Sequence, residues 1–403
     1  MRMKLNKSGQ LLLVSAASLL AASLVTACSS LTVDFVYVTS AKAAGTYSYG
    51  EVDVFEINSE SGAMRQIPTS PFPSGGRNPV AEAVSADYKD LYVVNRDDNT
   101  IVEFAIGNDG KIYPQNTINT AGIYPMATTV SGSNLFVLDT YYPNEACTTA
   151  SPCSGSIAVY PIGTANALGS AVTNTSTGSN YWKLSNGTSD VIVPTSVSVT
   201  ASGSYLYVSA YDATTLVAGN GNAGYIFGYQ VNTSGVLTPI LGSPWATGVG
   251  STPSAIATDA SSYVYVTDTA KNVVLGYSIS AGALTALGSY ATGNQPSAVV
   301  VDPSANYAYV TNAEDGTVTA YSISSGVLAR LGTNVTGGTY TTGQEPIAMG
   351  IDPSKHHFLF TVNYLGNSVS GFELAADGTL INSQGSPSAA NAEPTAVVAV
   401  PHQ

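Results

Sequence analysis

The chain ends with Glu393-Pro394-Thr395-Ala396-Val397-Val398-Ala399-Val400, a proline followed by small and β-branched residues. This composition is typical of a short strand that is buried on both faces. The same opening, a proline with Ala or Ser two residues later, occurs six times upstream. The seven prolines are Pro79, Pro125, Pro194, Pro253, Pro296, Pro346 and Pro394. The terminal strand is therefore one copy of a repeated element.

Three further patterns recur with these prolines. Where no insertion intervenes, successive prolines lie 46, 43 or 50 residues apart, a period that indicates a repeat protein. An aromatic residue in a second apolar strand follows each of the first six prolines after eleven to fourteen residues. A third strand repeats a β-branched, an aromatic and an aliphatic residue, as in Val318, Tyr321 and Ile323, and a weaker fourth strand follows a glycine turn. Four strands in each of seven repeats predict an all-β, seven-bladed β-propeller.

The two ends of the repeat array complement each other. The first repeat starts at its second strand, residues 33–38, and the last innermost strand, 394–400, has no partner after it. We therefore expect the C-terminal strand to pair into the N-terminal blade and close the ring. The propeller is predicted to span 33–403, with blades at about 33–70 plus 394–400, 79–120, 125–175, 194–241, 253–290, 296–333 and 346–386.

The first 27 residues read as a secretory signal. A basic start is followed by an apolar, Ala- and Leu-rich stretch and then by Val25-Thr26-Ala27-Cys28. This ending resembles a bacterial lipoprotein signal, in which the cysteine is lipidated and becomes the mature N-terminus. We expect lipidation of Cys28, a short linker at 28–32 and export to the periplasm or cell surface; an ordinary cleaved signal or an N-terminal membrane helix are the alternatives.

The remaining cysteines and the net charge indicate which bonds and partners to expect. Cys147 and Cys153 lie close together in one loop, so export predicts a local disulfide between them; no His or Cys nearby suggests a metal site. The net charge is −13, which disfavours nucleic acid as a partner. We expect a monomer without a cofactor, held at a membrane by its lipid and binding a protein or a carbohydrate.

The second strands also carry a family resemblance. Tyr309-Val310-Thr311-Asn312, Tyr265-Val266-Thr267-Asp268 and Tyr37-Val38-Thr39-Ser40 resemble the YVTN propeller repeat. The layout of nearly the whole mature chain is similar to that of the lactonase-type seven-bladed propellers, which include 6-phosphogluconolactonases and muconate-cycloisomerase-like enzymes. The resemblance implies a propeller and, as its activity, lactone hydrolysis or isomerisation.

Strand order places the candidate site on one face, here called the top. Loops before the innermost strands and turns between second and third strands emerge there, and so do the insertions at 41–50, 141–155, 163–193, 211–224 and 333–345. Insertions that gather on one face of a repeat protein indicate a binding surface. Alternatively, they are neutral changes in loops that tolerate insertion. Glu345, Glu393 and Arg77 fall at the channel mouth in successive repeats, where a carboxylate could act as a base. Alternatively, they only cap loops and pair with one another.

Other top-face residues are candidates for ligand contact. Trp182 lies in an insertion without a counterpart in other repeats, so we expect it to be exposed. The Asn or Asp that ends each second strand could bind a ligand or could form the turn. The full set of ligand-binding candidates is Arg96, Asp139, Tyr141, Trp182, Asp268, Asn312, Asn363 and Tyr364.

These residues leave two functions open. The sequence has no GxSxG, HExxH or phosphate-binding Gly-Lys-Ser/Thr motif, and no histidine is predicted at the top mouth. The first interpretation is an envelope-anchored binding or scaffold module that engages a protein or glycan through its top loops. The alternative is a lactonase-like hydrolase or isomerase that acts on a sugar lactone at the channel mouth. A deep pocket gathering Glu345, Glu393 and Arg77 would favour the enzyme.

Overall fold

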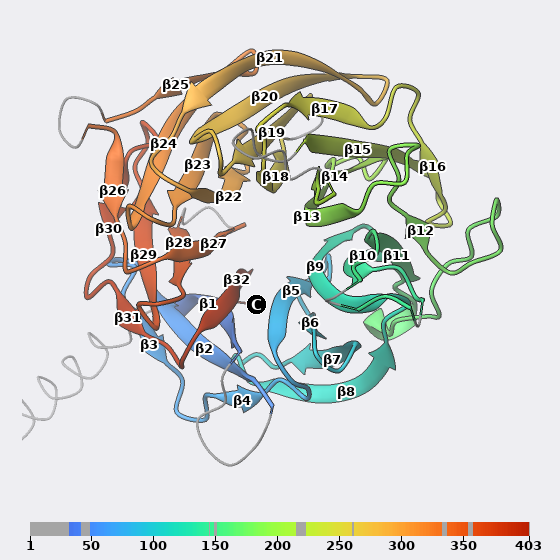
Figure 1. Ribbon diagram of the computed structural model, residues 1–403. Coiled ribbons are helices and arrows are strands. Elements are labelled where there is room, and N and C mark those ends of the chain that lie inside the picture. Colours follow the sequence, from blue (N-terminus) through green and yellow to red (C-terminus); the bar gives the residue numbers. More distant parts are fainter. Residues whose placement is uncertain are drawn as a thin grey trace, which may run out of the picture.

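The structure is a computed structural model that describes residues 32–41, 49–144, 146–148, 151–214, 223–259, 262–332, 337–353 and 358–402. The predicted signal segment and Cys28 lie outside these residues. The described chain forms seven antiparallel sheets arranged as blades around a central axis (Figure 1). The predicted seven-bladed propeller is thus confirmed. Its one described helix is a short 3₁₀ turn, η1 (Thr164–Asn166).

We number the blades in order around the ring and give their strands from the axis outward. Blade 1 contains β32 (Pro394–Pro401), β1 (Thr32–Ser40), β2 (Glu51–Asn58), β3 (Met64–Gln66) and β4 (Phe72–Pro73). Blade 2 contains β5 (Pro79–Val84), β6 (Asp90–Asn95), β7 (Thr100–Ile106) and β8 (Ile112–Asn119). Blade 3 contains β9 (Ile123–Ser131), β10 (Asn134–Tyr141), β11 (Ser156–Pro161) and β12 (Trp182–Lys183).

The other four blades follow the same order. Blade 4 contains β13 (Ile192–Val199), β14 (Tyr205–Asp212), β15 (Gly224–Val231), β16 (Leu237–Pro239) and β17 (Trp245–Gly248). Blade 5 contains β18 (Pro253–Thr258), β19 (Tyr263–Asp268), β20 (Val273–Ser280) and β21 (Ala283–Ala291). Blade 6 contains β22 (Pro296–Val301), β23 (Tyr307–Asn312), β24 (Thr317–Ser324), β25 (Val327–Arg330) and β26 (Thr339–Thr341). Blade 7 contains β27 (Pro346–Ile351), β28 (Phe358–Asn363), β29 (Ser368–Leu374), β30 (Leu380–Asn382) and β31 (Ser388–Ala389).

The repeated proline marks a β-bulge in every blade. The pairing between the innermost and second strands shifts register at this point in all seven sheets. Proline has no N–H to give to a ladder, so a bulge is where a strand tolerates it. The bulge fixes the direction in which each inner strand leaves the top face.

The tyrosines of the second strands connect neighbouring blades. The hydroxyl of Tyr309 in blade 6 donates to the carbonyl of Gly378 in blade 7, at 3.0 Å. The equivalent bonds run from Tyr37 to Gly110, from Tyr207 to Gly282 and from Tyr265 to Gly326. Because these rings are buried, each hydroxyl needs a partner, and the glycine turn before the outer strand supplies it. Two of the repeated sequence patterns therefore meet in one contact.

The C-terminal strand closes the ring, as predicted. β32 pairs with β1 from Ser40 opposite Pro394 to Asp34 opposite Pro401. Val400 and Ala399 are 1% and 3% exposed, and they belong to apolar clusters on opposite faces of blade 1. The C-terminus lies near the axis of the ring (Figure 1). No helix among the described residues is long and apolar enough to cross a membrane.

Two buried carboxyl groups lie where blade 7 meets blade 1. Asp34 on β1 and Asp352 after β27 are both fully buried, and Tyr88 of blade 2 is also near Asp352. Burial, followed by the charge of Asp352, raises the pKa of Asp34 to about 8. At neutral pH the folded chain therefore keeps a proton on Asp34 that the unfolded chain releases near pH 4.

This pKa shift predicts a pH dependence of stability. The free energy of unfolding should fall as the pH rises from about 4 to about 8, by up to about 1.4 kcal/mol per pH unit, because the folded state binds the extra proton. In Asp34→Asn the dependence should be weaker, and at about pH 8 the variant should be the more stable protein. Urea unfolding of both proteins at several pH values measures this. The same pH dependence in both would contradict the role of Asp34.

Candidate functional site

The top face carries the loops that precede the inner strands and the turns between second and third strands. These two sets are joined directly by hydrogen bonds. The backbone N–H groups of Arg96, Ala313 and Tyr364 donate to the carbonyls of Asn78, Gln295 and Glu345, at 3.0, 2.9 and 2.8 Å. Each turn is therefore held against the residue that enters its own inner strand.

One residue of each blade lies directly before the repeated proline, where the innermost strand begins at the top face; we call these seven the mouth residues. Around the ring from blade 1 these are Glu393, Asn78, Tyr124, Val193, Thr252, Gln295 and Glu345. Five of them have a left-handed backbone, with φ between 52° and 57°: Asn78, Tyr124, Gln295, Glu345 and Glu393. This conformation is uncommon for residues other than glycine, and such strain is often found at functional sites. These five mouth residues thus share one backbone conformation.

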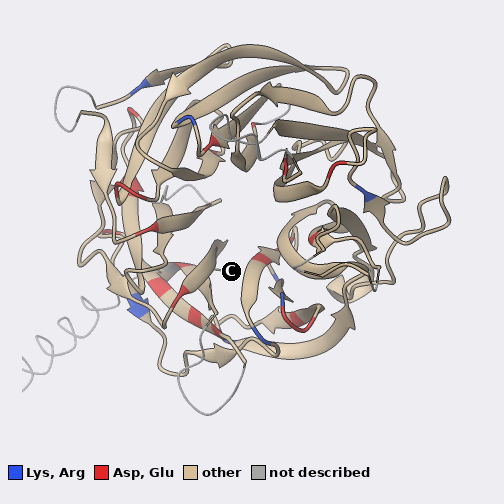
Figure 2. Cartoon of the chain, in the orientation of Figure 1, with Lys and Arg blue, Asp and Glu red and all other residues tan. Residues whose placement is uncertain are grey.

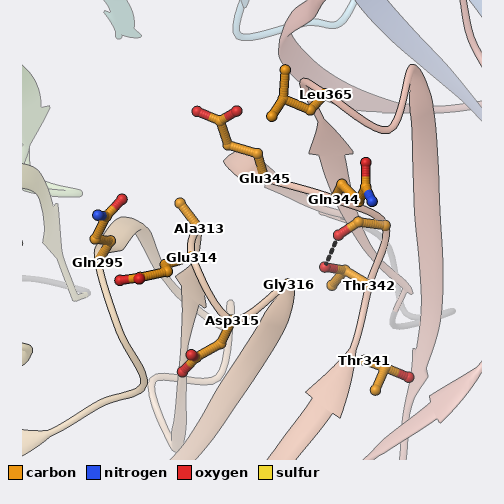
Figure 3. Close-up of a pocket in the computed structure, with 11 residues that line it drawn as sticks. Gln295, Ala313, Glu314, Asp315, Gly316, Thr341, Thr342, Gln344, Glu345 and Leu365 are labelled. Carbon is orange, nitrogen blue, oxygen red and sulfur yellow. Dashed lines mark hydrogen bonds between the residues drawn. The ribbon is translucent and has the colours of Figure 1, made fainter.

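A pocket of about 580 Å³ lies at this mouth between blades 6 and 7 (Figure 3). Its polar side chains are the carboxylates of Glu314, Asp315 and Glu345, the amides of Gln295 and Gln344 and the hydroxyls of Thr341 and Thr342. Leu365, which is 62% exposed, adds an apolar edge next to Glu345 (Figure 3). The size suits a ligand as small as one sugar ring.

The carboxylates of the pocket differ in how they are held. Asp315 accepts hydrogen bonds from the backbone N–H and the side-chain amide of Asn294, at 2.7 and 3.0 Å, so it braces the loop. Glu345 is half-buried and its side chain extends into the pocket (Figure 3). Of the three acids, Glu345 is the one whose backbone is left-handed, with φ of 54°.

A family comparison adds to this geometry. A family model described as "Lactonase, 7-bladed beta-propeller" matches residues 48–141 and 263–396, more than half of the chain. The chain belongs to this lactonase family. The matched part contains the pocket and the predicted residues Arg77, Glu345 and Glu393. None of the curated proteins matches the chain significantly.

Several solved structures share the fold of this lactonase-family propeller. A protein from Bacteroides fragilis, described as a candidate 6-phosphogluconolactonase, is 20% identical with a TM-score of 0.71, covering 92% of this chain and 99% of that one. A Pseudomonas aeruginosa periplasmic gluconolactonase is 18% identical with a TM-score of 0.70 and the same coverage. AztD from Citrobacter koseri is 12% identical with a TM-score of 0.54, at 92% and 99% coverage. At these identities the likeness shows the fold alone.

The lactonase-family propeller does not gather the three predicted catalytic candidates in one pocket. Glu345 lines the pocket, whereas Glu393 occupies the equivalent position in blade 1 and is not part of the lining. Arg77 pairs with Asp98 of its own blade, at 2.7 Å, and this bond raises the pKa of Arg77. Arg77 thus pairs at the surface with an acid of its own blade, whereas the alternative stated for it above was pairing among Glu345, Glu393 and Arg77 themselves.

Most residues that end the second strands hold the loops above them. Asp139, Asp268, Asn312 and Asn363 are at most 1% exposed. Asn312, for example, accepts from the N–H of Gly293 at 2.9 Å and donates to Thr319 at 2.9 Å. Burial raises the pKa of Asp139 well above its usual range. These contacts describe a structural role, and ligand binding by these residues stays a prediction.

Arg96 and Tyr141 are brought together by Tyr124, a mouth residue of blade 3. The Arg96 guanidinium lies 5.7 Å from the centre of the Tyr124 ring, which meets the Tyr141 ring edge-on at 6.0 Å. Tyr364, the last ligand-binding candidate, is half-buried beside Glu345, to whose carbonyl its N–H donates. The structure therefore places an aromatic group and an acidic pocket at different blades of the same mouth.

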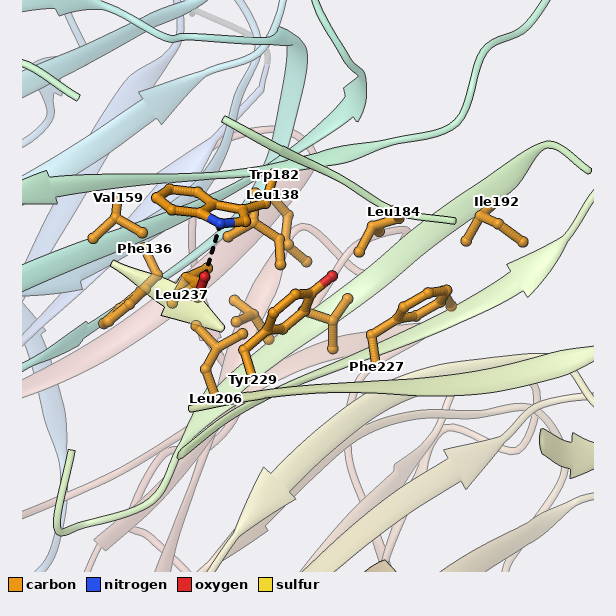
Figure 4. Packing of buried hydrophobic residues seen from close by; sticks show 14 residues of the cluster. Phe136, Leu138, Val159, Trp182, Leu184, Ile192, Leu206, Phe227, Tyr229 and Leu237 are labelled. Carbon is orange, nitrogen blue, oxygen red and sulfur yellow. Dashed lines mark hydrogen bonds between the residues drawn. The ribbon is translucent and has the colours of Figure 1, made fainter. Parts of the chain in front are cut away.

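The expectation that Trp182 is exposed is wrong. Trp182 is 5% exposed, packs against Val159 and Leu206, and donates its indole N–H to the carbonyl of Leu237 at 2.9 Å (Figure 4). The insertion folds back and supplies β12, the outer strand of blade 3, which pairs with β11. The tryptophan fills the space between blades 3 and 4.

The predicted disulfide is confirmed. Cys147 and Cys153 are bonded, with Cα atoms 5.4 Å apart, in the top loop of blade 3. Beside this loop, Tyr142 stacks on Tyr181 from the next insertion, and Lys183 lies 4.4 Å from the Tyr142 ring centre. Within the described part of the chain, no group of three His, Cys, Asp or Glu residues could hold a metal ion.

Proposed function

We propose that this protein hydrolyses a neutral sugar lactone in the pocket between blades 6 and 7. The observation that carries the proposal is the position of Glu345 in that pocket, in a chain of the lactonase family. A pocket of this size accommodates a single five- or six-membered lactone ring with its hydroxyl groups. The alternative function inferred from the sequence is therefore favoured over the binding or scaffold module.

Glu345 is the proposed general base. Its carboxylate takes a proton from the water that attacks the lactone carbonyl, a role typically worth 10²- to 10⁴-fold in rate. The amides of Gln295 and Gln344 can donate to and accept from ring hydroxyls, and Leu365 offers an apolar surface to the ring. These four lining residues thus each have a partner on a polyhydroxylated lactone.

The charge of the pocket supports a substrate without phosphate. Glu314, Asp315 and Glu345 are all acidic, and a phosphate group would meet three negative charges there. Figure 2 shows acidic positions at the strands nearest the axis and few basic ones. Of the basic top-face groups, Arg77 is paired with Asp98, and Arg96 lies over Tyr124. Both 6-phosphogluconolactonase and gluconolactonase appear among the names of structural neighbours, and the pocket favours the second chemistry.

An assay of lactone hydrolysis tests this proposal. The panel contains gluconolactone, galactonolactone and 6-phosphogluconolactone, with spontaneous hydrolysis subtracted. We expect kcat/KM for the best neutral lactone to exceed that for the phosphorylated one by at least about 30-fold, which corresponds to about 2 kcal/mol of repulsion. Turnover of the phosphorylated lactone alone would contradict the substrate class, and no turnover of any lactone would contradict the reaction.

The proposed place of action is the cell envelope. Support comes from the predicted lipoprotein signal that precedes Cys28 and from the disulfide, which is typical of an oxidising compartment. A lipid on Cys28 would hold the propeller at a membrane. If so, the wild type should fractionate with membranes and Cys28→Ala should not; equal membrane association of both would count against the anchor.

A further inference from the structure

Four blades share a four-residue turn between the second and third strands. The last residue of this turn is Asn99 in blade 2, Asn272 in blade 5, Gly316 in blade 6 and Asn367 in blade 7. All four have a left-handed backbone, with φ of 54°, 55°, 61° and 45°. The turns are therefore equivalent in backbone shape, and blade 6 differs by having no side chain at this position.

The three asparagines share one function, which is to accept a hydrogen bond from the next blade. Their side-chain oxygens accept from the backbone N–H of the mouth residue there. Asn99 binds the N–H of Tyr124 at 2.6 Å, Asn272 that of Gln295 at 2.9 Å, and Asn367 that of Glu393 at 2.9 Å. In each case the asparagine crosses the seam, meaning the interface between two consecutive blades.

At the seam between blades 6 and 7 this acceptor is absent. Gly316 stands where the asparagine would be, and the mouth residue it faces is Glu345. Among the described residues, no protein atom accepts a hydrogen bond from the Glu345 N–H. Gly316 and Glu345 both line the 580 Å³ pocket, so the missing side chain opens the pocket and leaves this donor facing it.

The N–H of the residue before the mouth residue is bound in a similar way, but its acceptor is an aspartate of the same blade. In blades 2 and 6 an aspartate at the third turn position accepts from the N–H two residues before the proline. Asp98 binds the N–H of Arg77 and Asp315 that of Asn294, both at 2.7 Å. In blade 7 the third position is Gly366, and within the described chain the N–H of Gln344 likewise has no protein acceptor.

We infer that the N–H groups of Gln344 and Glu345 form an oxyanion-binding pair that holds the carbonyl oxygen of the substrate. Two successive N–H groups at a left-handed residue form a concave donor site of the kind that binds anionic oxygens. For Gln344 and Glu345 the positions of both acceptors are glycines, Gly366 in the turn of blade 7 and Gly316 in that of blade 6, and within the described chain neither N–H has a protein acceptor. This inference rests on the proposed lactone hydrolysis and deepens it.

The N–H groups of Gln344 and Glu345 would supply the charge stabilisation that the hydrolysis needs beside the base Glu345. The water oxygen bonds to the lactone carbonyl carbon while the Glu345 carboxylate takes the proton, and the C=O electron pair moves onto oxygen. The two N–H groups hold that negative charge. Collapse of the intermediate re-forms C=O and breaks the bond to the ring oxygen, which takes the proton back from Glu345. The product is the open-chain hydroxy acid. Because Glu345 is neutral while the oxyanion exists, its side chain does not repel the charge; the repulsion from Glu314 and Asp315 is what the two N–H groups have to offset.

The substitution that tests the pair is Gly316→Asn. It restores the acceptor of the three other turns, and the backbone there already has the φ that those asparagines adopt. A Cβ at Gly316 would approach the Gly343 carbonyl oxygen to 3.2 Å, a contact that a small shift relieves. We expect the variant to fold, with a Tm close to that of the wild type, and to lose about 10²-fold or more in kcat.

Two controls separate the acceptor from other effects. Gly316→Ala adds a Cβ without an acceptor, so it reports the effect of the added carbon alone; its kcat should lie at least about tenfold above that of Gly316→Asn, at some cost in stability because of the left-handed backbone. Asn99→Gly removes the acceptor at the remote seam between blades 2 and 3 and should leave kcat unchanged. Full activity of a folded Gly316→Asn protein, or an equal loss in Gly316→Ala, would overturn the inference.

An amide readout distinguishes this inference from the proposed function. The probe is gluconolactam, a neutral lactam that keeps the carbonyl and resists hydrolysis. In ¹⁵N-labelled wild type, the amide proton signals of Gln344 and Glu345 should move downfield on binding, and in Gly316→Asn the Glu345 signal should not respond. Lactone turnover without these shifts overturns the inference and leaves the hydrolase; the shifts without any turnover support the donor pair and reject the hydrolase.

Discussion

A chain that lacks residues 393–403 is expected to fail to fold. This deletion removes β32, so β1 loses its hydrogen-bonded neighbour from Ser40 to Asp34 and becomes an open edge. It also removes Val397, Ala399 and Val400 from the clusters on the two faces of blade 1. We expect the free energy lost with this packing and pairing to exceed the free energy of unfolding, which is about 5–15 kcal/mol for a typical folded protein.

The measurement is solubility and thermal unfolding of the shortened chain. We expect aggregation on expression or the absence of a cooperative transition. Deleting only residues 402–403 is the matched control, since it keeps all of β32. It removes the contact between the rings of His402 and Phe35, whose centres are 5.5 Å apart. A soluble 393–403 deletion with an unchanged Tm would refute closure through this strand.

Glu345→Gln is expected to reduce kcat for the best lactone by 10²- to 10⁴-fold. Glutamine keeps the size and the hydrogen-bonding shape of the side chain but cannot take a proton from water. KM should change little, because the amide can still contact the substrate. The Tm should stay within a few degrees, because the substitution leaves the backbone contacts of Glu345 in place.

Glu393→Gln is the matched control for this variant. Glu393 is the same residue type, also directly before a repeated proline, with the same left-handed backbone in the neighbouring blade. Its N–H is bound by Asn367, and its side chain is not part of the pocket lining. The variant should keep kcat within about twofold. Loss of activity in Glu393→Gln with normal turnover in Glu345→Gln would assign the base to blade 1 instead.

The sequence predicted the features that repeat. The seven prolines, the second-strand aromatics and the glycine turns recur with the blade period, so the strands and blades could be counted from the sequence, and the closing role of β32 followed from the unequal ends. The contacts between the tyrosines and the glycine turns were not predicted. The Cys147–Cys153 bond followed from closeness in one loop. Trp182 could not be placed in this way, because its two-residue strand occurs once and its partner β11 lies across an insertion.

The candidate site was predicted only in part for a related physical reason. Glu345 could be assigned to the mouth from its position before Pro346, but the pocket depends on what a neighbouring blade lacks. A glycine at the end of a turn looks ordinary in the sequence, since asparagine and glycine both suit a left-handed backbone. Only the contacts of Asn99, Asn272 and Asn367 show which hydrogen bond Gly316 leaves out.

The position just before each repeated proline accommodates different side chains. In five of the seven blades the residue just before the proline has the same left-handed backbone although its side chain differs, so this backbone conformation does not depend on one type of side chain. Glutamate, asparagine, tyrosine and glutamine already occupy this position with nearly the same φ in five blades. Their side chains can therefore be exchanged one at a time with the blades left intact. The mouth thus offers several independent positions at which new substrate preferences could be engineered.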